Sequence, residues 1–582
     1  MLQINYDKQQ NLGLFQNFKD VFGFSTVQNY QPLYKDLFEL NDTNFNNIQL
    51  SSNFFLSKID QQICGKIDTY ITNHSKTFTN KKEIFFKFTP LLNPFKHITG
   101  KCSTTEMHLL PSFIEKNTTN RKIYNKNNSA YTECFFVHLA CKLKHNENFA
   151  NGIEYYGSYL GLKNEFAFDI YDDLDYLVKS SFFMREKNKS FVVEDFEDLF
   201  STCDANTIKK KKISLDNEEC LHLIDIEDFG DNFDDIFIDN TTTLNDFESI
   251  DANFFDNELN KCSETNESSK INEEKQGSRT DCSTSTCSSR TSCTTNSEDD
   301  CESDLSSFDE DSSGDSVSSC ASSTASSKSQ HVMATLPSFP VNIIAMEKFD
   351  NTLESLIVND ELTDEKWFAV LMQIVMSLLV YQSAFAFTHN DLHTNNVMYK
   401  ETEIKFLYYK YKNEIYRVPT YGKIFSIIDF GRSIYKFKGD IYYSDCFEAG
   451  GDANSQYNSE PYFNGNKPRL EPNYSFDLCR LGCSIFDFLI EDIEDVENVT
   501  SPLTKLIVEW CTDDRGINVL YKKNGEDRYP DFKLYKMIAR HVNKHTPANQ
   551  LKRKEFMQFK ISEEVLSMES VKIVNIDNLR FY

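Results

Sequence analysis

The sequence predicts an α+β fold that is interrupted by a long disordered acidic insert. Strand-like apolar runs alternate with short helical patterns up to residue 203. Acidic, serine and threonine residues then dominate as far as residue 336. Apolar patterns of helical period prevail after residue 350. These three changes along the chain predict the architecture.

The same changes divide the 582 residues into an N-terminal extension (1–24), a first globular part (25–203), the insert (204–336) and a second globular part (337–582). Within 25–203, Glu83–Phe88 and Gly152–Leu162 are typical of strands, whereas Tyr131–Leu143 places its apolar side chains at helical spacing.

The insert holds most of the net charge of −28. Within 214–330 acidic side chains greatly outnumber basic ones, and about half of the positions in 276–330 are serine or threonine. Such a segment buries too little apolar surface to offset its conformational entropy, so we expect disorder. The rest of the chain is nearly neutral, and a nucleic-acid partner is therefore not expected.

One segment has the length of a membrane span. Trp367–Phe387 contains no formally charged side chain and is long enough to cross a bilayer as a helix. Polar side chains at Gln373, Ser377 and Gln382 interrupt it, so a buried core helix is favoured over a membrane helix, and no membrane contact is expected. The 16 cysteines show no zinc-binding spacing and the first residues do not resemble a signal peptide. We therefore expect reduced thiols and a cytoplasmic location.

The residues that carry chemistry lie in two short strings. His389-Asn-Asp-Leu-His-Thr-Asn-Asn396 is followed, further along the chain, by Asp429-Phe-Gly431. Phosphoryl transfer requires a carboxylate to orient the attacking hydroxyl and oxygen ligands to hold Mg²⁺. Asp391 is the candidate base, and Asn396 and Asp429 are the candidate Mg²⁺ ligands. Gly431 is expected to let the backbone turn just after the metal ligand.

These strings resemble the catalytic and metal-binding motifs of the protein kinase family. The resemblance implies a two-lobed kinase fold, with a β-rich small lobe, a mainly helical large lobe, and ATP and Mg²⁺ in the cleft. It assigns 25–203 to the first part of the small lobe, 337–349 to the hinge strand with the hinge, and 350–582 to the large lobe. It also implies that Asp477 begins a buried helix that anchors the catalytic loop. Met346–Phe349 is similar to a gatekeeper and hinge, which places Glu347 and Phe349 beside the adenine.

The family resemblance also implies an ion pair in the small lobe. Lys87 stands where the third-strand lysine that contacts the α- and β-phosphates is expected. Glu133 is the candidate for its partner, and Glu106 is an alternative that is closer to the usual spacing but lacks the helical pattern.

Three phrases resemble, more narrowly, the divergent haspin-like kinases of large nucleocytoplasmic DNA viruses, such as iridoviruses and mimiviruses. The phrases are Phe85–Leu92, Tyr155–Ser158 and Ser426–Arg432. This resemblance implies a monomeric serine/threonine-protein kinase that acts on protein substrates. It also implies a location in the host cytoplasm or in a virion.

The sequence departs from the family pattern, and two alternatives stay open. No glycine-rich loop precedes Lys87, since Gly65 is the only glycine between residues 24 and 99, and Asn390 replaces the usual arginine. One alternative is a small-molecule phosphotransferase of the aminoglycoside or choline kinase type. The other is a pseudokinase scaffold that displays the acidic insert. The long span from Asp429 to Asp477 favours a polypeptide substrate over a small molecule.

Overall fold

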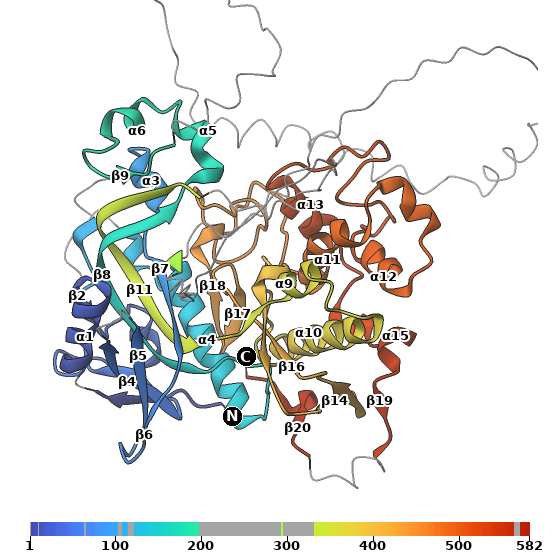
Figure 1. The fold of residues 1–582 in the computed structure, drawn as a ribbon, viewed down its shortest axis with the longest axis horizontal. Coiled ribbons are helices and arrows are strands. Elements are labelled where there is room, and N and C mark those ends of the chain that lie inside the picture. Colours follow the sequence, from blue (N-terminus) through green and yellow to red (C-terminus); the bar gives the residue numbers. More distant parts are fainter. Residues whose placement is uncertain are drawn as a thin grey trace, which may run out of the picture. The chain divides into compact units, whose positions relative to one another are not determined.

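The structure is a computed structural model that describes residues 2–9, 11–62, 66–102, 107–114, 121–196, 331–563 and 571–581, with the backbone alone at 293–294. Apart from Phe196, the described residues belong to one compact unit, Met1–Asp195 with Ser288–Tyr582. Most of the predicted disordered insert (204–336) lies outside the described residues. The compact unit is a mixed α/β structure with several sheets and helices (Figure 1).

The largest sheet has the strand order β10-β7-β11-β8-β2, and β9 also pairs with β11. Its strands are β2 (Phe24–Gln28), β7 (Ile84–Pro90), β8 (Tyr155–Asp169), β9 (Val192–Val193), β10 (Cys293–Thr294) and β11 (Met333–Glu347). All neighbouring pairs are antiparallel, and the pairing of β7 with β11 places Lys87 opposite Ile344. Strand β11 begins at Met333, inside the range predicted for the insert, because the long strand β8 pairs with it from Asp169 onward.

Helix α4 (Ser129–Asn146) packs against this sheet and is buried on nearly every side. Asn342 of β11 donates a 2.8 Å hydrogen bond from its side chain to the Ala130 carbonyl of the helix. The Phe136 ring lies 4.4 Å from the Phe387 ring and 4.6 Å from the Phe430 ring, measured between centroids. Helix α4 therefore joins the large sheet to the segments that carry the candidate catalytic residues.

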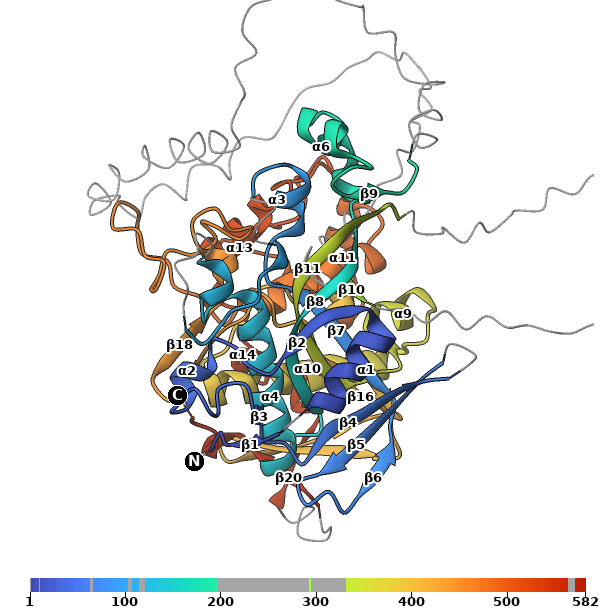
Figure 2. The same cartoon turned by 90° about the vertical axis from the view of Figure 1, so that its left-hand side faces the viewer.

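Smaller elements surround the large sheet. They are β1 (Tyr6–Lys8), α1 (Leu12–Phe22), α2 (Tyr34–Leu37), β3 (Ile48–Leu50), β4 (Phe54–Gln61), β5 (Ile67–Asn73), β6 (Thr79–Lys81), α3 (Pro94–Ile98), α5 (Leu174–Leu177) and α6 (Ser181–Glu186). Strands β4, β5 and β6 form a sheet of their own, and Figure 2 shows α1 lying beside β4 and β2. The predicted N-terminal extension thus supplies a strand and a helix that pack on this part of the structure.

The rest of the chain is mainly helical. Its helices are α9 (Leu353–Val358), α10 (Asp364–Phe385), α11 (Phe476–Leu489), α12 (Pro502–Trp510), α13 (Lys533–His541), α14 (Pro547–Gln550) and α15 (Lys554–Met557). Among the described residues, α10 is the one helix that is long and apolar enough to cross a membrane. However, 89% of its most apolar 18-residue stretch is buried inside the protein. The helix contacts α12, α14, α15 and β16 (Lys423–Ile427). Helix α10 is therefore a core helix in this structure.

Three small sheets accompany these helices. Their strands are β12 (Asn351–Thr352), β13 (Val397–Glu401) and β16; β14 (Phe406–Tyr411), β15 (Glu414–Pro419), β19 (Lys560–Ile561) and β20 (Ile573–Asn575); and β17 (Ile434–Phe437) with β18 (Asp440–Tyr443). The pairing of β13 with β16 positions the candidate active site, because the catalytic loop precedes β13 and the Asp-Phe-Gly string follows β16.

Candidate active site

Strand pairing brings two of the predicted residues into one place. Val397 pairs with Ile427 in the antiparallel ladder of β13 and β16, and the Ile428 N–H donates a 2.9 Å hydrogen bond to the Asn396 carbonyl. Asn396 ends a short 3₁₀ turn (Thr394–Asn396), and Asp429 follows Ile428 directly. The ladder therefore brings together the two candidate metal ligands, which are well separated in the sequence.

The candidate catalytic loop, His389–Asn396, is anchored by Asp477 at the start of α11. Its two carboxylate oxygens accept hydrogen bonds of 2.9 Å each from the backbone N–H groups of His389 and Asn390. The His389 ring is fixed on both sides, since its Nε2–H donates to the Ile428 carbonyl at 2.8 Å and its Nδ1 accepts from the Asp391 N–H at 3.2 Å. These bonds define both the ring tautomer and the position of the Asp391 backbone.

The Asp391 carboxylate is 2% exposed and its two oxygens have different neighbours. Oδ1 accepts a 2.7 Å hydrogen bond from the Tyr535 hydroxyl, and that hydroxyl accepts in turn from Arg480 Nε at 3.0 Å. Oδ2 faces Arg432 Nη1 at 3.8 Å. Neither of these two atoms has a hydrogen-bond partner among the described residues. Oδ2 is thus the oxygen left to accept a proton from another group.

The charges around Asp391 keep it ionised. Burial raises the pKa of its carboxyl group, but the cations of Arg432 and Arg480 and the Tyr535 hydrogen bond lower that pKa by more, to below its ordinary value. The nearby His393 is neutral near pH 7, because burial lowers its pKa to about 4. The site therefore holds an anionic carboxylate flanked by two arginines.

Lys87 joins the large sheet to the Asp-Phe-Gly string. Its ammonium Nζ lies 2.5 Å from Glu133 Oε1 on α4 and 2.9 Å from Asp429 Oδ1. Burial lowers the pKa of Lys87, but the carboxylates of Asp429 and Glu133 raise it by more, so the ammonium stays charged. The second Glu133 oxygen accepts a 3.2 Å hydrogen bond from the Thr89 hydroxyl. The structure therefore brings Lys87, Glu133 and Asp429 into one buried cluster.

The chain turns at Gly431 and Arg432, as predicted, and the Ser433 N–H closes this turn on the Phe430 carbonyl at 3.0 Å. The strained backbone conformation, however, lies at Asp429. Asp429 has φ of 63°, in the left-handed region, whereas Gly431 has no positive φ. A Cβ built on Gly431 would meet Asp429 Oδ1 at 3.5 Å, an ordinary contact. Aspartate adopts this conformation more readily than most residues, and such backbone strain is concentrated at functional sites.

Asn396 is buried next to the base. Its amide nitrogen donates a 2.9 Å hydrogen bond to the Asp391 carbonyl, and this contact orients the side chain. Because the amide nitrogen is used in this way, the amide oxygen is the atom suited to a hard cation such as Mg²⁺.

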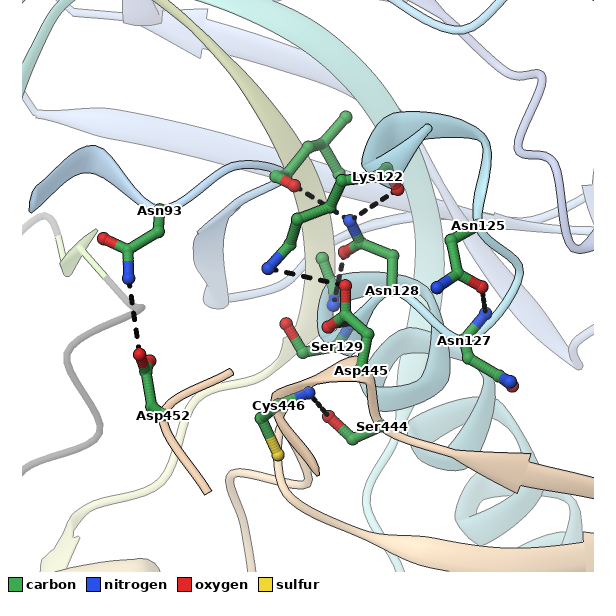
Figure 3. A network of polar contacts seen from close by, with 12 residues as sticks. Asn93, Lys122, Asn125, Asn127, Asn128, Ser129, Ser444, Asp445, Cys446 and Asp452 are labelled. Atoms are coloured by element: carbon green, nitrogen blue, oxygen red, sulfur yellow. Dashed lines mark hydrogen bonds and ion pairs between the residues drawn. The ribbon is translucent and has the colours of Figure 1, made fainter. Parts of the chain in front are cut away.

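A cleft runs from these residues toward the N-terminus of α4. Its lining includes Asp391, Asp429, Arg432, Lys96, Lys122, Asp445 and Asp452. Figure 3 shows the polar network at its far side: Lys122 Nζ lies 3.4 Å from Asp445 Oδ2, and the other Asp445 oxygen accepts from the Ser129 N–H at 3.0 Å. The segment after the Asp-Phe-Gly string is thereby held against the first turn of α4.

The two predicted adenine-site residues lie apart from this cluster. Glu347 ends β11 opposite Ile84 in the ladder, and its side chain is buried and paired with Lys144 Nζ at 2.7 Å. Phe349 is buried just beyond it. No contact of Glu347 or Phe349 with Lys87, Asp391 or Asp429 is found among the described residues. Their part in nucleotide binding stays a prediction.

Asn390, which stands where kinases have an arginine, is fully hydrogen-bonded. Its amide oxygen accepts from the Tyr457 hydroxyl at 2.7 Å, and its amide nitrogen donates to the Arg432 carbonyl at 2.9 Å. A neutral contact therefore ties the segment after the Asp-Phe-Gly string to the catalytic loop. Two residues weighed from the sequence, Gly65 and Glu106, lie outside the described residues.

The residues that surround Asp391 were not predicted from the sequence. Arg432 follows the Asp-Phe-Gly string directly, so its position offered a usable signal. Tyr535 lies 144 residues from Asp391, and Asp445 lies 316 residues from its partner Ser129. No local pattern marks contacts at such separations.

Comparison with known proteins relates part of the chain to protein kinases. No protein-family model matches it. The serine/threonine-protein kinase haspin of the mouse (Mus musculus) is 31% identical over 113 residues, which are 19% of this chain and 13% of the mouse protein. Haspin of cattle (Bos taurus) is 35% identical over 77 residues, 13% of this chain and 10% of the bovine protein. The chain is thus similar to haspin over a small part of either length.

Proposed function

We propose that the protein is an ATP-dependent protein kinase that transfers the γ-phosphate to serine or threonine hydroxyls of protein substrates. In this proposal the large sheet with α4 is the small lobe of a kinase, β11 leads into the hinge, and residues 350–582 form the large lobe. The partial similarity to haspin supports a kinase of that type. We also propose that the kinase is of the viral, haspin-like type. This part rests on the Asp391-Leu-His393 form of the loop and on the phrases Phe85–Leu92, Tyr155–Ser158 and Ser426–Arg432.

The observation that carries the proposal is the pair of unbonded polar atoms at the base. Asp391 Oδ2 and Arg432 Nη1 lie 3.8 Å apart, both lack a hydrogen-bond partner among the described residues, and both residues line the cleft. Buried polar groups are normally satisfied, so this pair suits an incoming hydroxyl. Asp391 Oδ2 accepts the hydroxyl proton and Arg432 donates to its oxygen.

The side chains of Asn396, Asp429 and Lys87 suit Mg²⁺ and a nucleoside triphosphate. Asn396 offers an amide oxygen and Asp429 a carboxylate, both hard oxygen ligands, while Lys87 is a buried cation held against Asp429 at 2.9 Å. Mg²⁺, when bound, neutralises charge on the β- and γ-phosphates. Glu133 keeps Lys87 extended toward the phosphates, and the anchored loop keeps Asp391 at the transferred group.

The segment between Asp429 and Asp477 supports a protein substrate. It contains the β17–β18 hairpin and is tied to α4 through Asp445 and to the catalytic loop through Tyr457. A long segment held on both sides of the cleft offers a surface on which a polypeptide can dock. The proposal includes a cytoplasmic monomer without nucleic-acid or membrane partners.

A phosphate-transfer assay tests the proposal. Purified protein, radiolabelled ATP and Mg²⁺ are combined with a panel of acidic, basic and neutral proteins, for the wild type, Asp391→Asn and Lys87→Met. Loss of the base is expected to reduce the rate by about 10²–10⁴-fold. Asp42→Asn and Lys19→Met, at exposed positions outside the segment between Asp429 and Asp477, are the matched controls. Full activity of Asp391→Asn would overturn the proposed role of Asp391.

The same preparation separates the alternatives. A pseudokinase scaffold binds Mg-ATP without turnover, so nucleotide binding and phosphate transfer are measured side by side. A small-molecule phosphotransferase labels aminoglycosides or choline but not proteins. Transfer of label to a protein substrate by the wild type, but not by Asp391→Asn or Lys87→Met, supports the proposal.

A further inference from the structure

A second cluster of chemically reactive side chains lies at the opposite end of α4. Cys141 and His145 are one turn apart near its C-terminal end, so they project from one face of the helix. Glu154 immediately precedes β8. Their ligand atoms, one sulfur, one imidazole nitrogen and one carboxylate oxygen, all lie within 4.8 Å of one another.

The chain is shaped so that Glu154 returns close to the helix. A Cβ built on Gly152 would meet the Ala140 carbonyl oxygen at 2.6 Å, so a side chain there would push the loop away from α4. The Glu154 N–H donates a 2.8 Å hydrogen bond to Glu347 Oε1, which fixes the backbone at this point. The three side chains therefore meet because Gly152 permits the loop to lie close to α4 and because the buried Glu347 carboxylate holds the Glu154 backbone.

We propose that Cys141, His145 and Glu154 form a binding site for a single Zn²⁺-like transition-metal ion. Thiolate sulfur and imidazole nitrogen select such ions over Mg²⁺ or Ca²⁺, which take oxygen ligands. Three protein ligands leave a fourth position for water or another ligand.

The distances fit this assignment after a small adjustment. His145 Nε2 lies 2.8 Å and Cys141 Sγ 3.9 Å from Glu154 Oε2. Tetrahedral Zn²⁺ at its usual bond lengths separates such donor atoms by about 3.3–3.6 Å. The first distance is shorter and the second longer than these values, and the Cys141 and His145 ligand atoms lie within 4.8 Å of each other. Binding therefore requires the half-buried His145 and Glu154 side chains to adjust.

The surroundings supply the outer contacts that metal sites use. Ser52 Oγ lies 3.6 Å from Cys141 Sγ and is held in place by its 3.0 Å bond to the Tyr155 carbonyl. Lys144 Nζ lies 3.8 Å from Glu154 Oε1, the carboxylate oxygen that faces away from the imidazole contact. Such outer partners orient the ligands. Cys141 is buried, whereas His145 and Glu154 are 23% and 18% exposed, so an ion can enter from that side.

Cobalt substitution tests the site directly and does not depend on kinase activity. The full chain, kept reduced and freed of metal with a chelator, is titrated with Co²⁺. A thiolate-to-cobalt charge-transfer absorption and the visible bands of a tetrahedral site are expected, and Zn²⁺ should remove them in a one-to-one ratio. Absence of these bands in the folded wild type would overturn the proposal.

Single substitutions assign the bands to this cluster. Cys141→Ser should abolish the charge-transfer absorption, and His145→Gln should weaken Zn²⁺ binding by more than the roughly 10–100-fold that loss of an outer partner costs. Two substitutions outside the cluster serve as controls. Cys134→Ser changes a thiol two turns earlier in α4, and His74→Gln removes an imidazole that lies 2.9 Å from Asp7. Both controls should bind as the wild type does. Bands that persist in Cys141→Ser, with circular dichroism showing a folded variant, would place the metal at other thiols and refute the site.

Discussion

The Tyr535 hydroxyl donates a 2.7 Å hydrogen bond to Oδ1 of Asp391, although the two residues are 144 positions apart. Arg480 Nε donates to the same hydroxyl oxygen at 3.0 Å, which directs the hydroxyl proton toward the carboxylate. Tyr535 lies on α13 and is 2% exposed. One carboxylate oxygen of the candidate base is thus occupied by the protein itself, and the other faces Arg432.

Removing this hydroxyl should change the acid dependence of catalysis. Tyr535→Phe keeps the ring but loses a hydrogen bond to a charged group, which contributes roughly 1.5–3 kcal/mol. The Tyr535 bond lowers the pKa of Asp391, so its loss raises that pKa. The base must be ionised, and the acidic limb of the kcat/KM profile should therefore move to higher pH by about one unit. A pH–rate profile of both proteins measures this.

The matched control for this variant is Tyr416→Phe. Its hydroxyl also donates to a carboxylate, Glu414 Oε2 at 2.8 Å, on strand β15. This variant should keep the wild-type profile. An unchanged acidic limb in Tyr535→Phe would show that the contact does not act on the base.

Arg432→Gln should move the acidic limb of the kcat/KM profile to a higher pH than Tyr535→Phe does. After burial, the Arg432 charge has the largest influence on the pKa of Asp391, and it lowers that pKa. Its removal therefore raises the pKa by more than loss of the Tyr535 hydroxyl does. The pH–rate profile again measures the effect, and Arg469→Gln, in an exposed ion pair with Glu471, serves as the control. A smaller shift than in Tyr535→Phe would contradict this order.

Glu133→Gln should separate nucleotide binding from acceptor binding. The substitution removes one of the two carboxylates that hold Lys87, so the KM for ATP should rise about 10-fold while the KM for the protein acceptor changes little. Stability should fall by roughly 1–3 kcal/mol, because a buried ammonium loses a charged hydrogen-bond partner. Steady-state kinetics and urea unfolding measure the two effects.

The corresponding surface pair provides the comparison. Glu414→Gln removes an ion pair with Lys560 in which the lysine and glutamate side chains are 42% and 43% exposed, and such pairs contribute up to about 1 kcal/mol. Equal destabilisation by the two substitutions would mean that the Lys87–Glu133 contact adds nothing beyond a surface pair.

His97 should make the fold sensitive to mild acid. It is buried on α3 with its ring edge-on to Phe339 at 5.2 Å, and burial lowers its pKa to about 4. The unfolded chain binds a proton near pH 6.5, so the contribution of neutral His97 is complete above that pH and is lost as the pH falls toward 4. Urea unfolding at pH 7 and pH 5 measures this. Between the two pH values, His97→Met should lose about 1–2 kcal/mol less of its free energy of unfolding than the wild type does. The control variant His108→Gln, at an exposed position, should lose as much free energy of unfolding as the wild type.

Much of the site's local geometry was readable from the sequence because neighbouring residues define it. The apolar strings after Asn396 and before Asp429 predicted two strands, and these pair as β13 and β16. Helical spacing between Tyr131 and Leu143 predicted the helix that carries Glu133. The predicted turn at Gly431 is observed at Gly431 and Arg432, whereas the positive φ lies at Asp429, since composition alone does not show which residue is strained.

By itself, the sequence determined the order of the elements, the reactive residue types and their local spacing, because side-chain period and short loops depend on near neighbours. Only the tertiary structure decided which distant groups surround them. Tyr535 and Arg480 reach Asp391 because α13 and α11 pack together, and Cys141 meets Glu154 because Gly152 permits a close return of the chain. The ionisation of the base depends on such long-range contacts, since burial and opposing charge are properties of the packed molecule.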